Sequence, residues 1–130
     1  MIKFLISSIF IVLLSGCSAQ KAFYSSTDKK AIKAYEAALV CFNNIDHITG
    51  LPNIPCVQSL LEKALKRDST FVEAYSLASN MSVEKGDIET AIFYREKMID
   101  VSQRVPIQEY FYLASMQMAT GKYESCLKNA

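Results

Sequence analysis

The sequence predicts an all-α fold of antiparallel helix pairs, and three observations lead to that prediction. Apolar residues recur with the three- and four-residue spacing of a helix face, and no stretch alternates as a strand does. A pattern of residue types repeats after 35 positions, and each copy carries a glycine at the same point. The matched pairs are Tyr75 and Tyr110, Ala78 and Leu113, Ser79 and Ala114, Gly86 and Gly121, and Ala91 and Cys126. Each copy is therefore predicted to form a helix, a glycine turn and a second helix.

The first unit, residues 28–68, is the least regular of three. Its two predicted helix faces consist of Ile32, Tyr35, Leu39 and Phe42, and of Val57, Leu60, Leu61, Ala64 and Leu65. The segment between them, residues 43–55, is several residues longer than the turns of the later units. We expect a loop there.

The second unit, residues 70–103, carries signals for helix ends. Thr70 and Glu73 have the spacing of a capping box before the first helix. Gly86 can adopt the left-handed conformation that ends that helix, and Asp87 is placed to cap the next one. The second helix then presents an apolar stripe made of Ile88, Ala91, Ile92, Met98 and Ile99.

The third unit, residues 106–130, begins with Pro106, which suits the opening of a helix that ends before Gly121. Position 130 falls inside its second helix, so the unit is incomplete. Stacked helix pairs bury their apolar faces against their neighbours and normally finish with a polar cap. We therefore expect the chain to be a piece of a longer protein, and the alternative is that its last helix frays.

The N-terminus has the order of charged, apolar and small residues that is typical of a signal peptide. The apolar run at residues 4–14 is too short to cross a bilayer as a helix, for which roughly 20 residues are needed. The run ends in Leu14-Ser15-Gly16-Cys17, which resembles the lipobox of bacterial lipoproteins. That resemblance implies a cleaved signal at 1–16, lipid attachment at Cys17 and a tether at 17–27. Because Ser18 replaces the Asp that retains such proteins in the inner membrane, the resemblance favours an outer-membrane anchor. No acidic run of the kind that marks surface export follows Cys17, which favours a domain that faces the periplasm.

The mature chain resembles the tetratricopeptide repeat, a helical hairpin of about 34 residues that stacks into a solenoid. The resemblance covers Ala74 to Ile99 and Tyr110 to Leu127. In the last unit the matching residues are Tyr110, Leu113, Ala114, Gly121, Tyr123, Cys126 and Leu127. The middle unit departs from the pattern, since Ala78, Ser82 and Arg95 stand where Leu and two aromatic residues are usual.

The repeat resemblance implies a concave groove lined by the first helix of each unit, which binds a peptide segment. By position, the lining is Glu73, Ser76, Asn80, Val83 and Glu84 in the middle unit and Gln108, Phe111, Ser115 and Met118 in the last. This lining is polar to mildly acidic and lacks basic residues, so it favours a neutral or basic partner segment. The alternative is that these side chains are merely solvated.

The residues give no support for catalysis, a cofactor, a metal or a small-molecule substrate. His47 is the one histidine and has no second ligand at metal-binding spacing, and the glycines form no phosphate loop. With 14 basic and 13 acidic residues, the chain also lacks the excess positive charge of a nucleic-acid-binding protein. Cys41 and Cys56 lie near the loop-connected ends of two helices, where either a disulfide or two buried thiols would fit.

These observations favour a non-enzymatic, lipid-anchored scaffold that binds another envelope protein. Lipobox-bearing arrays of this type also resemble the N-terminal part of larger lipoproteins that continue into a β-propeller and an OmpA-like peptidoglycan-binding domain. The alternative function is therefore an envelope tether or a secretion-system component.

Overall fold

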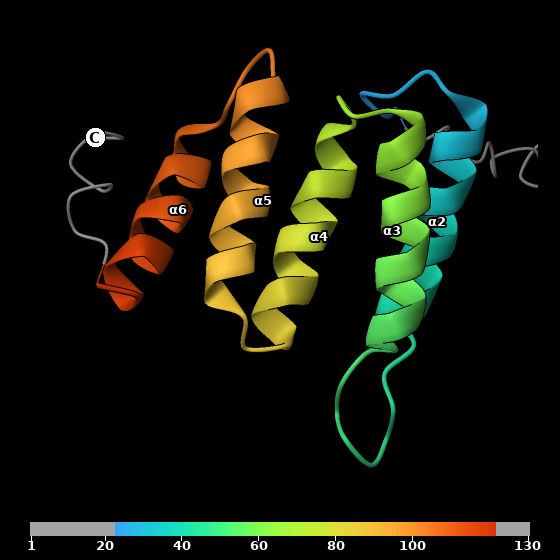
Figure 1. Ribbon diagram of the computed structural model, residues 1–130, viewed down its shortest axis with the longest axis horizontal. Coiled ribbons are helices and arrows are strands. Elements are labelled where there is room, and N and C mark those ends of the chain that lie inside the picture. Colours follow the sequence, from blue (N-terminus) through green and yellow to red (C-terminus); the bar gives the residue numbers. More distant parts are fainter. Residues whose placement is uncertain (1–22, 122–130) are drawn as a thin grey trace, which may run out of the picture.

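The computed structural model describes residues 23–121, which form five helices and no strand (Figure 1). The helices are α2 (Lys29–Asn43), α3 (Ile54–Arg67), α4 (Val72–Glu84), α5 (Ile88–Val101) and α6 (Ile107–Ala119). Successive helices run in opposite directions and pack as neighbours, α2 on α3, α3 on α4, α4 on α5 and α5 on α6. The expectation of an all-α fold with packed helix pairs is confirmed for this part of the chain.

Polar side chains set where the first two helices begin. Asp28 caps α2, because its carboxylate accepts hydrogen bonds from the backbone N–H groups of Lys30 and Ala31. The side chain of Asn53 caps α3 in the same way through the N–H of Cys56. Both caps satisfy donors that have no partner inside the helix. The long loop expected between these helices is present at residues 44–53.

The end signals of the second unit are confirmed except for the capping box. Gly86 ends α4 with a φ of +75°, a conformation that costs glycine little, and Asp87 caps α5 through the N–H of Thr90. The capping box is wrong, because α4 starts after Phe71 with no side-chain cap from its own unit. The hydroxyl oxygen of Ser25 instead accepts a hydrogen bond from the N–H of Val72.

The 35-residue repeat is visible in the backbone itself. Helices α4 and α6 each contain 13 residues, and both of their ends are displaced by the repeat length. At the end of α4 the N–H of Gly86 donates to the carbonyl of Val83 at 2.8 Å, and at the end of α6 Gly121 donates to Met118 at 3.1 Å. Gly86 and Gly121 share a φ of +75°. Equivalent residues therefore make equivalent turns.

The buried residues form two clusters rather than one. The larger joins α2, α3 and α4 around Phe71, which is fully buried at the corner between α3 and α4 and contacts the rings of Tyr24 and Tyr35. The smaller joins α5 and α6 through Ala91, Ile92, Leu113 and Met116. The smaller cluster thus forms the apolar contact between the second and third units, and the boundary between the two clusters falls between α4 and α5.

The chain before α2 packs on the domain. Tyr24 lies edge-on to Tyr35, and the backbone N–H and the hydroxyl of Ser25 both donate to the carboxylate of Glu73. The part of the expected tether that the structure describes, residues 23–27, is therefore largely held against α4 and the corner before it. Several predictions concern residues that the structure does not describe. They are the signal peptide at 1–16, the lipid attachment at Cys17 and the second helix of the last unit, with Tyr123, Cys126 and Leu127.

None of the helices at residues 23–121 is both long enough and apolar enough to span a membrane.

Candidate functional site

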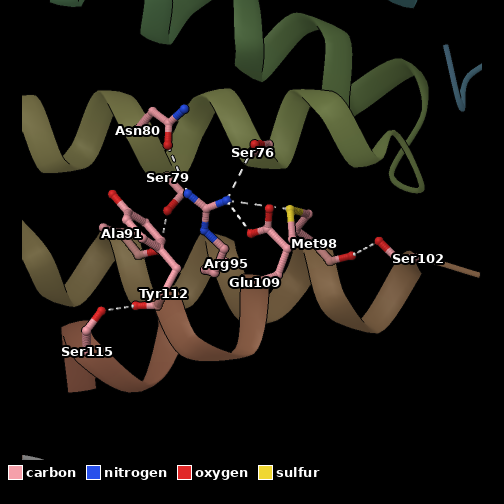
Figure 2. A network of polar contacts seen from close by, with 10 residues as sticks. All are labelled: Ser76, Ser79, Asn80, Ala91, Arg95, Met98, Ser102, Glu109, Tyr112 and Ser115. Atoms are coloured by element: carbon pink, nitrogen blue, oxygen red, sulfur yellow. Dashed lines mark hydrogen bonds and ion pairs between the residues drawn. The ribbon is translucent and has the colours of Figure 1, made fainter. Parts of the chain in front are cut away.

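The middle-unit positions predicted to line a groove do not share one role. Ser76 and Asn80 lie one turn apart on α4 and both point toward Arg95 of α5 (Figure 2). Asn80 accepts a hydrogen bond from Arg95 Nη2 at 2.9 Å, while Ser76 lies 3.5 Å from Nη1. These two polar residues therefore belong to an internal network between helices as well as to the surface.

Arg95 is the centre of that network. Arg95 is 3% exposed, and its guanidinium reaches from α5 to α6, where Nη1 lies 2.9 Å from the carboxylate of Glu109. The ring of Tyr112 covers the guanidinium with its centroid 4.7 Å away. A buried charge is tolerated only when it is paired and hydrogen-bonded, and α4 and α6 supply those partners.

The sequence patterns did not predict this function of Arg95, Glu109 and Tyr112. They indicate Arg95 only as a departure from a position where an aromatic residue is usual, and they predict a groove lining without basic residues. The structure places one basic group directly beneath Ser76 and Asn80. The available signal was a lone arginine inside an otherwise apolar stripe, with an acidic residue in the first turn of the next unit.

The remaining middle-unit positions lie apart from this network. Glu73 accepts two hydrogen bonds from Ser25, so its carboxylate holds the N-terminal segment in place. Val83 is partly buried against the smaller apolar cluster. Glu84 is exposed at the end of α4. The structure thus brings Ser76 and Asn80 together but separates them in function from the other three positions.

The last-unit positions are all exposed on α6. Phe111 is 69% exposed and Met118 is 56% exposed. Residues seven positions apart lie on the same side of a helix, so these two side chains face the same way with Ser115 between them. The hydroxyl of Ser115 donates to the carbonyl of Tyr112 and Gln108 is exposed. This helix therefore presents an aromatic ring and a thioether to solvent, without a covering side chain that the structure describes.

The structure joins Cys41 and Cys56 in a disulfide, with their Cα atoms 6.0 Å apart. The bond closes the base of the loop at residues 44–53, in which His47 is exposed. Asp46 organises the loop, because its carboxylate accepts hydrogen bonds from the N–H groups of Thr49 and Ile48, which lower its pKa. Within residues 23–121 there is no group of three or more His, Cys, Asp or Glu side chains that could hold a metal ion.

Several acidic and phenolic groups titrate away from their ordinary values because of their structural contacts. Hydrogen bonds from the side chains of Ser26 and Thr70 lower the pKa of Asp68. The N–H of Ala31 and the side chain of Arg67 lower the pKa of Asp28. Burial raises the pKa of Tyr35 to about 12. All of these groups serve helix ends or the core, which gives no indication of acid–base catalysis.

No protein-family model matches the chain, and a search of the curated proteins finds no match either. The function of this chain is therefore inferred from its sequence patterns and from the geometry of its helices.

Proposed function

We propose that this chain is a lipid-anchored protein of the tetratricopeptide-repeat type that acts as a non-enzymatic binding scaffold in the bacterial envelope. The single observation that carries the repeat assignment is the match between α4 and α6. Both helices have the same length, end at a glycine with the same φ and close with equivalent hydrogen bonds. A repeating hairpin that stacks on its neighbours is built to expose an extended surface to a partner.

The binding face in this proposal is the exposed side of α6, formed by Gln108, Phe111, Ser115 and Met118. Aromatic and Met side chains are enriched at protein interfaces, and their exposure here makes them available for burial by a partner. Ser76 and Asn80 extend the face on α4, where Arg95 already engages both from below. The partner is another envelope protein that offers a neutral or basic segment, for which Glu84 and the polar residues provide acceptors.

The lipid anchor in this proposal is Cys17, which follows Leu14, Ser15 and Gly16 in the order of a lipobox. The proposed location is the outer membrane, with the helices in the periplasm. An anchor raises the local concentration of the binding face for other envelope components without any additional contact.

Two measurements on cells that express the full chain test this proposal. A fatty-acid probe should label the wild-type chain and fail to label Cys17→Ala, and equal labelling of both would refute the anchor. A photoreactive residue placed at position 111 should form an adduct with one envelope protein, whereas the same residue at position 93 should not. Phe93 is the matched control because it is an exposed aromatic residue on α5, at 51%. Adducts from both positions, or from neither, would refute the binding face.

A further inference from the structure

A shallow hollow on the first helix pair is lined by three lysines. Lys30 and Lys33 of α2 and Lys63 of α3 surround a floor made of Ala34, Ala37 and Leu60, and the hollow has a volume of about 280 Å³. All three lysines are exposed. We call this feature the basic hollow.

The lysines of the basic hollow form no ion pair within residues 23–121. Three acids of the same helix pair have other partners: Glu36 accepts a hydrogen bond from Tyr24, Glu62 accepts one from Gln58, and Asp28 caps α2 and pairs with Arg67. The hollow therefore combines three lysines that lack a paired carboxylate with a small apolar floor.

The basic hollow lies at the end of the helix pair where the chain enters the domain. Helix α2 begins at Lys29, directly after the N-terminal segment, and α3 ends at Arg67 (Figure 1). The contact of 2.9 Å between Arg67 Nη2 and Asp28 Oδ2 shows that these two helix ends are adjacent. Lys30, Lys33 and Lys63 each lie within about two turns of that end.

We propose that the basic hollow binds the anionic headgroups of a phospholipid bilayer. The inference rests on the proposed lipid anchor, because an anchor at Cys17 would bring the bilayer to the end of the domain through which the chain enters. Lysine stems lie along apolar surface while their ammonium groups reach outward, which matches the arrangement around Ala34, Ala37 and Leu60. Contact with the headgroups would orient the helices and leave α6, at the other end of the stack, free for a partner.

The test uses the full chain carrying Cys17→Ala, so that binding to vesicles does not depend on a covalently attached lipid. The chain is floated with vesicles of phosphatidylcholine that contain phosphatidylglycerol and, separately, with vesicles of phosphatidylcholine alone. The measured quantity is the ratio of the two partition coefficients, because the apolar N-terminal run can enter both kinds of vesicle. We expect each of Lys30→Gln, Lys33→Gln and Lys63→Gln to lower this ratio about fivefold, and added salt to lower it further.

The matched control is the triple variant Lys85→Gln, Lys97→Gln and Arg104→Gln, which removes the same charge from exposed positions outside the hollow. It should change the ratio much less than the triple variant of the hollow, which combines Lys30→Gln, Lys33→Gln and Lys63→Gln. Equal effects of the two triple variants would overturn the inference. So would binding of soluble polyglutamate that depends on the hollow lysines while vesicle binding does not, since that result would assign the hollow to an acidic protein segment.

The outcomes separate this inference from the proposed function. If a fatty-acid probe labels Cys17 but the Lys→Gln variants of the hollow leave the partition ratio unchanged, the proposed anchor is supported and headgroup binding by the basic hollow is refuted. If the partition ratio depends on the hollow lysines but Cys17 is never labelled, headgroup binding is supported and the proposed anchor is refuted.

Discussion

Among single residues, Arg95 makes the most contacts between helices that the sequence did not predict. A charged side chain occupies a position that would suit an aromatic ring, and its burial is compensated because α4 supplies an amide and α6 supplies a carboxylate and a ring to surround it. Buried ion pairs contribute little net stability compared with an apolar replacement, but removal of one partner leaves a buried charge without compensation. Arg95 Nε already lacks a hydrogen-bond partner, so the site has no reserve acceptor for the guanidinium.

The first prediction concerns Glu109, whose carboxylate pairs with Arg95. Glu109→Gln should lower the free energy of unfolding by about 2 to 3 kcal/mol, because a buried guanidinium loses its counterion. Adding Arg95→Met in the same chain should restore much of that loss, since the charge that needed pairing is gone. Denaturant unfolding of both variants measures this, and equal stability of Glu109→Gln and wild type would show that the pair is not stabilising.

Hydrogen bonds from Ser26 and Thr70 lower the pKa of Asp68 in the folded state. The unfolded chain therefore binds more protons at acid pH, so this contribution to stability is present above the ordinary pKa of the carboxyl. It is lost as the pH falls through the lowered value. Asp68→Asn should consequently flatten the acid side of the stability curve below about pH 5.

Thermal unfolding across that pH range measures the effect of Asp68→Asn. Asp100→Asn is the control because Asp100 is an exposed carboxylate on α5. A variant at Asp68 that keeps the full acid dependence of the wild type would contradict the assignment of the effect to these hydrogen bonds.

At the scale of elements, the sequence predicted helix positions and most helix ends, because those depend on local patterns. The end of α4 at Gly86 and the cap of α5 at Asp87 depend on residues within one helical turn. The start of α4 could not be predicted in the same way. Its orphan N–H at Val72 is satisfied by Ser25, which is 47 residues away along the chain. A tertiary contact of that kind has no local signature.

The loop between α2 and α3 yields a prediction about stability. The disulfide between Cys41 and Cys56 closes a loop with a sequence separation of 15, and a cross-link of that size stabilises a fold by about 3 kcal/mol through the entropy of the unfolded chain. Cys41→Ala with Cys56→Ala should lower the free energy of unfolding by about that amount. Addition of a reductant should lower the stability of the wild type but not of the double variant. A wild type that is insensitive to reductant would contradict the prediction.

At the scale of the whole molecule, the repeat predicted how the helices pack but not how the core is divided. Helical spacing gives each buried face, and stacking then follows because no single hairpin can hide its apolar side. The boundary between the two clusters falls between α4 and α5, where the buried Arg95 of α5 bonds to Asn80 of α4 and pairs with Glu109 of α6. Likewise, the sequence placed nine residues on one presumed groove, but only contacts across helices show that Ser76 and Asn80 also hold an arginine.

Taken together, the proposals give the stack of helix pairs two functional ends, a membrane-facing end at α2 and α3 and a partner-binding face on α6. The binding face is the part of the proposal that most needs a test, because exposed apolar residues are common on protein surfaces and need not bind anything. A decisive variant must therefore change the face without disturbing the fold. Phe111 and Met118 meet this condition because both are more than half exposed.

The most direct test measures how much of the envelope protein that crosslinks at position 111 is captured by the chain with Phe111→Asp and Met118→Asp. If α6 is the binding face, capture should fall about tenfold or more, while the melting temperature stays near that of the wild type and the control Phe93→Asp captures as much as the wild type. Undiminished capture by the folded double variant would show that α6 is not the binding face.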